Sequence, residues 1–140
     1  MYTTPPQNDP APSLVGTRIL IVDDEKGPRE SLRMILSPNH DVLTADSGAD
    51  ALEVLARTSV DLMTIDLNMP GMPGDQLARR LAEADPLVVP VLITGWDLKP
   101  DDARRAAFDF CVQKPMDDLN LVEGIVARAV QLHDRRAEER

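Results

Sequence analysis

The sequence predicts an α/β fold in which one parallel β-sheet carries helices on both faces. Two observations lead to this prediction. Five short apolar segments alternate along the 140 residues with five segments of helical periodicity, so that strand and helix follow one another five times. The apolar runs are also uninterrupted, which is typical of parallel strands buried on both faces. Right-handed crossovers between such strands give a single layered domain.

The composition bounds the class of protein. Apolar residues make up 43% of the chain and aromatic residues only 3%, so aliphatic side chains must fill the one core that a chain of this length forms. The net charge of −9 argues against a nucleic-acid backbone or an anionic membrane as a partner. Cys111 is the single cysteine, which excludes an internal disulfide and a cysteine zinc site. With no signal peptide and no long apolar run, we expect a cytoplasmic protein.

The first half of the chain begins with a proline-rich segment, residues 1–16, which we expect to be a flexible extension before a domain spanning 17–133. The apolar segments predict strands at Arg18–Val22, Asp41–Ala45 and Val60–Ile65. Helical spacing and start signals predict helices from Gly27-Pro28 to about Ser37, and from Gly48 to about Arg57 with Leu52, Leu55 and Ala56 facing inward.

The second half continues the same alternation. Strands are expected at Pro90–Ile93 and Asp109–Gln113, and helices at Asp75–Ala84 and Pro100–Ala107. The Pro100–Ala107 segment is rich in Ala and Arg without a strong apolar stripe, so its helix should be weakly anchored. Asp117 or Asp118 can cap a last helix that ends near residue 133, and residues 134–140 are expected to form a polar tail.

Polar residues of unusual character stand where the predicted strands end. Asp23 and Asp24 follow the first strand, and Asp66 follows the third. Thr94 and Lys114 follow the fourth and the fifth. Because the carboxyl ends of parallel strands share one edge of the sheet, and open α/β sheets bind ligands at that edge, we expect these five side chains to form one site.

The chemistry of this site follows from its charges. Three carboxylates held close together repel one another unless a cation lies between them, and an all-oxygen ligand set suits Mg²⁺ or Mn²⁺. The main-chain carbonyl of Asn68 is near enough in sequence to contribute. A carboxylate beside such an ion can attack phosphorus, so Asp66 is a candidate nucleophile. Thr94 and Lys114 would then contact oxygens of the phosphoryl group.

Four motifs resemble the receiver domain of two-component response regulators. They are the Ile19–Val22 strand with Asp23-Asp24-Glu25, the segment Asp66–Gly74, Leu92-Ile93-Thr94-Gly95, and Val112-Gln113-Lys114-Pro115. The resemblance covers residues 18 to about 133. It implies a flavodoxin-like (βα)5 fold with strand order 2-1-3-4-5, an order for which a receiver is a standard example.

The same resemblance implies the roles of the site residues. Asp66 would be the phosphoacceptor. Mg²⁺ would be bound by Asp23, Asp24, Asp66 and the main-chain carbonyl of Asn68. Thr94 and Lys114 would be the signalling pair that responds to phosphorylation. The phosphoryl group would come from a histidine of a sensor kinase or phosphotransfer protein, and its hydrolysis would reset the switch. The protein would thus catalyse its own modification without being a conventional enzyme, and switch the binding of a downstream protein or output domain.

The chain departs from the family pattern at two positions. The family commonly has Tyr or Phe where this chain has Cys111, and the neighbouring Phe110 should point to the opposite face of the strand. The second position is Trp96, which follows Thr94-Gly95. In the family, hydrolysis rates depend on the residue two after the phosphoacceptor and the residue two after the threonine. In this chain those residues are Asn68 and Trp96. The Lys114-Pro115 bond is a candidate for the cis isomer that the family usually has.

Other functions were weighed against the receiver. A phosphohydrolase of the haloacid dehalogenase type uses similar residues, but it places the nucleophile on the first strand, whereas here the acidic pair comes first. A nucleotide-binding protein lacks support because neither a G-x-G-x-x-G motif nor a P-loop occurs. A degenerate receiver that acts only as a protein interaction module stays open. The sequence also leaves open whether the chain is a stand-alone receiver or a fragment of a longer protein. A homodimer through the face of the fourth helix and fifth strand is possible as well.

Overall fold

The structure is a computed structural model that describes residues 17–95, 98–114 and 118–139. The strands are β1 (Arg18–Val22), β2 (Asp41–Ala45), β3 (Leu62–Asp66), β4 (Val89–Thr94) and β5 (Phe110–Gln113). The helices are α2 (Lys26–Leu36), α3 (Gly48–Arg57), α4 (Gly74–Ala84) and α5 (Leu119–Glu138), with a 3₁₀ helix, η1 (Ala103–Ala107), between β4 and β5. All strand pairs are parallel and the order is β2-β1-β3-β4-β5, which confirms the predicted fold and strand order.

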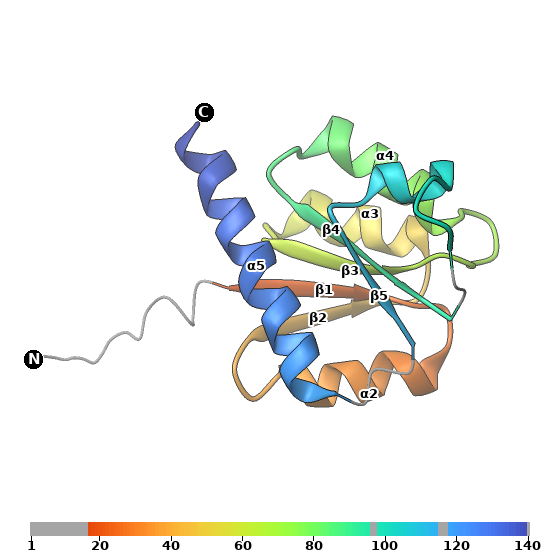
Figure 1. The fold of residues 1–140 in the computed structure, drawn as a ribbon, viewed down its shortest axis with the longest axis horizontal. Helices are drawn as coiled ribbons and strands as arrows, with labels where there is room; N and C mark the ends of the chain where they lie inside the picture. The colour runs from red at the N-terminus through yellow and green to blue at the C-terminus, as the bar shows by residue number, and fades with distance from the viewer. Residues whose placement is uncertain (1–16, 96–97, 115–117, 140) are drawn as a thin grey trace, which may run out of the picture.

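The sheet separates two apolar cores. On one face, Leu32 and Leu36 of α2 and Val122 and Val126 of α5 pack against Ile19 and the neighbouring strands. On the other face, α3 and α4 cover the sheet through residues that include Ala51, Leu77 and Leu81. Figure 1 shows α2 on one side of the sheet and α3 and α4 on the other. No helix among the described residues is long and apolar enough to cross a membrane.

The register brings the carboxyl ends of the strands to one edge. Val22 of β1 lies opposite Ile65 of β3, so Asp23 and Asp66 leave the sheet at the same level. Thr94 lies opposite Gln113 at the ends of β4 and β5, so Lys114 follows directly beside Thr94. The sequence pattern alone places the polar residues after the strands, and the register then brings them together.

The connection between β4 and β5 differs from the prediction. In place of a helix over Pro100–Ala107, the described part of this connection has only the five-residue η1, and none of its residues is buried. Asp102 starts it by accepting a hydrogen bond from the Arg104 main-chain N–H (2.9 Å). Because this segment has no apolar stripe, a longer helix here would gain little stability from tertiary packing.

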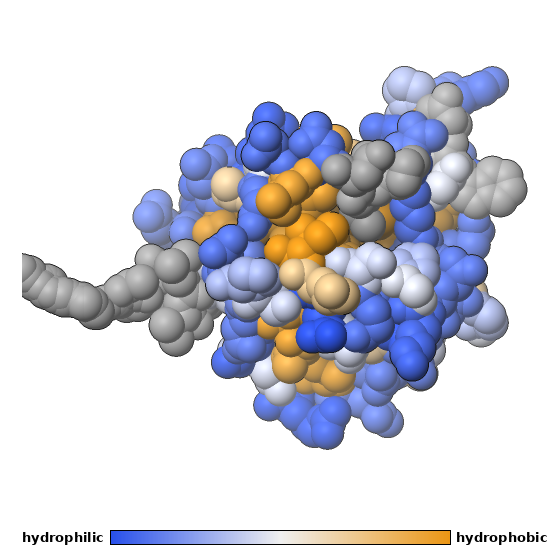
Figure 2. Space-filling model, turned by 90° about the horizontal axis from the view of Figure 1, so that it is seen from below, coloured by the Kyte–Doolittle hydropathy of each residue, from blue (hydrophilic) through white to orange (hydrophobic). Residues whose placement is uncertain are grey.

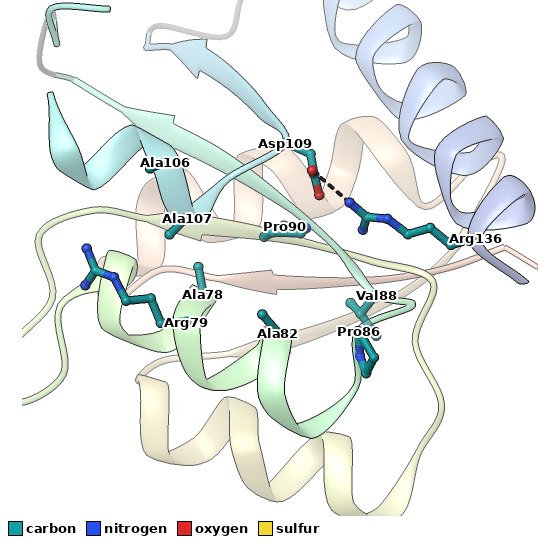
Figure 3. Close-up of a pocket in the computed structure, with 10 residues that line it drawn as sticks. All are labelled: Ala78, Arg79, Ala82, Pro86, Val88, Pro90, Ala106, Ala107, Asp109 and Arg136. Atoms are coloured by element: carbon teal, nitrogen blue, oxygen red, sulfur yellow. Dashed lines mark hydrogen bonds and ion pairs between the residues drawn. The ribbon is translucent and has the colours of Figure 1, made fainter. Parts of the chain in front are cut away.

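A groove of about 530 Å³ lies between η1 and α4. Its walls, shown in Figure 3, are mostly small side chains from these two elements and from the start of β4. They are Ala78, Arg79, Ala82, Pro86, Val88, Pro90, Ala106, Ala107, Asp109 and Arg136. Pro86 and Val88 precede β4 and Pro90 is its second residue, so the groove lies toward the edge of the sheet opposite the acidic residues.

Helix α5 continues beyond the expected end near residue 133. Residues 134–138, which we expected in a polar tail, form its last turn and a half, and Figure 1 shows this end projecting past the sheet. Two side-chain contacts join it to the rest of the domain: His133 Nε2 lies 3.5 Å from Asp61 Oδ1, and Arg136 forms an ion pair of 2.8 Å with Asp109. At the other end Asp118 accepts a hydrogen bond from the Leu121 N–H, which confirms one of the two predicted caps. Asp117 lies outside the described residues.

The prediction for α3 was wrong at one position. Ala56, expected to face inward, is exposed, while Ala51 is fully buried in the core. Leu52 and Leu55 are half-buried and pack against the same core. The buried face of α3 therefore lies closer to the amino end of the helix than apolar spacing alone indicated.

Thr64 of β3 leaves an unsatisfied hydroxyl in the core. The residue is 4% exposed, and its Oγ1 has no hydrogen-bond partner among the described residues. Its surroundings include Leu62, Val91 and Ile93. We expect Thr64→Val to raise the free energy of unfolding by about 1 kcal/mol, because an unpaired buried hydroxyl costs ~1–3 kcal/mol. Urea unfolding measures this, and a loss of stability would show that the hydroxyl is hydrogen-bonded in solution.

Candidate functional site

Three carboxylates meet at the carboxyl edge of the sheet. Oxygen atoms of Asp23, Asp24 and Asp66 all lie within 4.8 Å of one another. They come from the turn after β1 and from the last residue of β3, as the sequence predicted. Asp23 is almost fully buried, Asp66 is half-buried and Asp24 is exposed, so the cluster opens toward solvent on the side of Asp24.

Lys114 faces this cluster. Its Nζ lies 3.3 Å from Asp23 Oδ2 and 3.4 Å from Asp66 Oδ1, so a single ammonium bridges two of the three carboxylates. Burial disfavours the charged ammonium, but the negative charges of Asp66 and Asp23 outweigh it, and the pKa of Lys114 is raised. The side chain is therefore a fixed positive charge at neutral pH.

The electrostatics of Asp66 differ from those of an ordinary surface aspartate. Burial raises the pKa of its carboxyl group above the usual value; Lys114 opposes the increase, while Asp23 and Asp24 add to it. The site thus holds a carboxylate whose negative charge is poorly stabilised by the protein alone. A further cation near Asp66 would relieve this, and so would the transfer of an electrophilic group to it.

Thr94 ends β4 beside Lys114. The residue is 1% exposed, and its main-chain carbonyl accepts a hydrogen bond of 2.8 Å from the Lys114 N–H. The ends of β4 and β5 are therefore joined at the site. Both residues lie where the sequence placed them.

Gly74 is a residue of this site that the sequence analysis missed. A Cβ atom built on Gly74 would overlap the main-chain carbonyl oxygen of Asp66 and would lie 3.0 Å from the Ile65 side chain. The Gly74 N–H also donates to the carbonyl of Leu67 (2.8 Å). The start of α4 thus lies directly against the backbone of Asp66. A glycine among several in a Pro/Gly loop gave no signal that distinguished it.

The remaining predicted residues take different places. Asn68 is exposed in the loop after β3, beside a hollow of about 340 Å³ that Asp24 also lines. Cys111 is half-buried and packs with a small cluster of Leu67, Leu92 and Leu98, whereas Phe110 packs on the opposite face of the sheet. As predicted, the side chains at positions 110 and 111 thus lie on opposite faces of the sheet. Trp96 and Pro115 lie outside the described residues.

The donor set fits a divalent cation that prefers oxygen. Three carboxylates within reach of one point supply hard ligands, and the exposed side of the cluster leaves room for water or a further oxygen. No histidine or cysteine belongs to this cluster. The chemistry of the donors is that of Mg²⁺ or Mn²⁺ sites rather than of Zn²⁺ sites.

Comparison with known proteins gives a family match over most of the chain. The family model of the response regulator receiver domain matches residues 19–126. Protein PilH of Pseudomonas aeruginosa is 34% identical over 116 residues, which are 79% of this chain and 95% of PilH. Response regulator protein FleR of the same species is also 34% identical, over 81% of this chain. This chain spans only 24% of the length of FleR, so FleR contains much that has no counterpart here.

Solved structures show the same fold. Response regulator protein TrrA of Thermotoga maritima, in complex with Mg²⁺-BeF, is 29% identical with a TM-score of 0.72, covering 79% of this chain and 97% of that one. The signal receiver domain of an HD domain-containing protein of Pseudomonas fluorescens is 27% identical with a TM-score of 0.77, covering 87% of this chain and 92% of that one.

A sensor kinase is also among the sequence relatives. The sensor histidine kinase RcsC of Salmonella typhi is 32% identical over 85% of this chain, which corresponds to only 13% of RcsC.

Proposed function

Because the chain belongs to the receiver domain family of response regulators, we propose that it accepts a phosphoryl group on Asp66 in a Mg²⁺-dependent reaction. Phosphorelay signalling is the function that the comparisons support, and none of them favours a phosphorylation-independent interaction module. The observation that carries the assignment to Asp66 is its position between two further carboxylates and the ammonium of Lys114.

The proposed reaction is an attack of a carboxylate oxygen on phosphorus. An Oδ atom of Asp66 forms a bond to the phosphorus of a phosphohistidine, and the bond from phosphorus to the imidazole nitrogen breaks. The electron pair of that bond stays on the imidazole. The product is an acyl phosphate on Asp66, and its hydrolysis returns the free carboxylate. The raised pKa of Asp66 marks a carboxylate whose negative charge is poorly stabilised before the reaction.

Two neighbouring residues would act on the transferred group. The ammonium of Lys114, already within 3.4 Å of Asp66, would pair with a phosphoryl oxygen and compensate its charge. The hydroxyl of Thr94 would donate a hydrogen bond to another oxygen, and this bond would draw the end of β4 toward Asp66. This movement is the proposed switch, because it favours one arrangement of β4, η1 and β5 over another.

We further propose that Asp23, Asp24 and Asp66 bind the Mg²⁺ ion, together with the main-chain carbonyl of Asn68. The oxygen donors within 4.8 Å of one another support this, as does the Mg²⁺-BeF complex of the similar TrrA. When bound, the ion supplies charge neutralisation for the transferring phosphoryl group. The protein's own part is to hold the carboxylates together, to exclude water around Asp23, and to keep Asp24 accessible.

The partner proposed is a helical protein that carries the phosphohistidine. Figure 2 shows apolar side chains gathered on the face of the molecule that α2 covers. The large exposed apolar side chains of the described residues are Met34 on α2 and Leu119 and Leu121 at the start of α5. Helix α2 begins two residues after Asp24, so a helix that docks on these side chains could present its histidine to Asp66.

Mass spectrometry with a small phosphodonor tests the proposal. We expect incubation with Mg²⁺ and acetyl phosphate to add one phosphoryl group to the intact protein, and EDTA to prevent the gain. Reduction with borohydride followed by peptide mapping should then locate the modification at Asp66. No mass gain under conditions that label a receiver domain of established activity would contradict phosphoryl acceptance and favour an interaction module.

A further inference from the structure

The turn that carries Asp23 and Asp24 is held by a side chain of the first turns of α2. Arg29 Nη1 donates a hydrogen bond of 2.8 Å to the main-chain oxygen of Asp23. Asp23 is 6% exposed with Arg29 in place, and in the part of the chain that the structure describes the guanidinium is the donor that reaches this oxygen. A buried carbonyl without a partner is unfavourable, and the peptide would have to turn to find another donor.

The two carboxylates of this turn are held very differently. The carboxylate of Asp23 accepts a hydrogen bond from the Glu25 N–H (2.9 Å) and pairs with Lys114. For the carboxylate of Asp24, by contrast, the structure of the described residues contains no hydrogen-bond partner. The direction of the Asp24 side chain therefore depends on the orientation of the peptide that joins it to Asp23. The oxygen of that peptide is the atom that Arg29 binds.

We propose that Arg29 is a positioning residue, which fixes the peptide between Asp23 and Asp24 so that both carboxylates face Asp66. The inference rests on the proposed function, because it concerns the same metal site. Arg29 acts through the backbone and needs no contact with the metal or with the phosphoryl group. Arginine suits this task, since its planar guanidinium keeps a fixed geometry, whereas the ammonium of lysine is a point charge on a flexible stem.

Variants at position 29 and a matched control separate positioning from general effects. Arg29→Met removes the hydrogen bond, and Arg29→Lys keeps the charge without the planar donor. Arg33→Met is the control, because Arg33 lies one turn further along α2 and pairs with Glu30 at 2.9 Å, away from the site. Thermal unfolding should show that each variant remains folded.

The first measurement is Mg²⁺ binding by titration calorimetry without phosphodonor. We expect Arg29→Met and Arg29→Lys to bind Mg²⁺ about tenfold more weakly, the lower end of the loss seen when residues behind metal ligands are changed. At saturating Mg²⁺, phosphorylation by acetyl phosphate should return to nearly the wild-type rate. Unchanged affinity in Arg29→Met, or an equal loss in Arg33→Met, would overturn the proposal. Full affinity in Arg29→Lys would assign the effect to charge and overturn positioning as well.

A second measurement does not depend on the metal. In the metal-free protein, ¹⁵N relaxation should give lower order parameters for the Asp24 and Glu25 amides in Arg29→Met than in the wild type or Arg33→Met. Unchanged order parameters would contradict positioning. Asp24→Asn distinguishes failure of the metal site itself: if this variant keeps the wild-type Mg²⁺ affinity, the proposed metal site is wrong, and the relaxation data alone decide the role of Arg29.

Discussion

Replacing Asp66 by asparagine is expected to abolish phosphorylation while leaving the protein folded. The amide has nearly the shape of the carboxylate, but it carries no negative charge and is a poor nucleophile toward phosphorus. Incubated with Mg²⁺ and acetyl phosphate, the variant should show no gain in intact mass. Asp101→Asn is a matched control, because Asp101 is exposed in the β4–β5 connection, and it should be labelled like the wild type. A mass gain in Asp66→Asn would place the phosphoacceptor elsewhere.

The same substitution should make the metal-free protein more stable, and the gain should depend on pH. The pKa of Asp66 is raised in the folded protein, mainly by burial, so the folded state binds its proton more tightly than the unfolded chain. The stability that comes from the protonated form is therefore complete below the unfolded pKa of about 3.8 and is lost as pH rises through the raised value. In urea unfolding, the stability of Asp66→Asn relative to the wild type should increase as pH rises through this window. A difference in stability that does not change with pH would contradict the raised pKa.

Gly74→Val is expected to disturb the site from a position that touches no ligand. The added side chain would collide with the main-chain carbonyl oxygen of Asp66, which is fixed in β3, and would press on the side chain of Ile65, which is fully buried in the core. Overpacking of this kind costs about 1–3 kcal/mol in free energy of unfolding. The displacement of Asp66 should also slow labelling by acetyl phosphate at saturating Mg²⁺ by about tenfold or more, because small misplacements of reacting groups reduce rates strongly.

Gly124→Ala is the matched control for this substitution. Gly124 lies within α5, and a Cβ built there meets no atom within 4 Å. We expect the change to stabilise the protein by about 0.4–1 kcal/mol through the unfolded chain and to leave labelling unaffected. Urea unfolding and the initial labelling rate measure both effects. Wild-type stability and rate in Gly74→Val would show that the contact between α4 and Asp66 is looser than the structure indicates.

Strand boundaries and the principal site residues could be predicted because they depend on local patterns. The β1 and β2 strands match their predicted limits, since apolar runs end there at charged or turn-forming residues. Asp23, Asp66, Thr94 and Lys114 follow strands that must be parallel, so topology alone brings them to one edge. The cluster of three carboxylates could therefore be predicted from the strand topology, without information on side-chain contacts.

Other features could not be predicted, since they depend on tertiary contacts between segments. The segment before β5 has the helix-favouring residues Ala and Arg, yet only η1 forms, because no apolar face anchors a longer helix. The end of α5 stays helical beyond His133, where Arg136 pairs with Asp109, the residue directly before β5. Arg29 gave no signal either, since its role depends on a carbonyl oxygen rather than on another side chain.

The main-chain hydrogen bond from Lys114 to Thr94 links the two residues energetically. It joins the ends of β4 and β5 at 2.8 Å, so a pull on either strand end is carried to the other by the backbone rather than by a chain of side chains. We therefore expect their contributions to the proposed activated state to be cooperative. The free-energy cost of removing both side chains should differ from the sum of the single losses, as holds for groups that share one structural element.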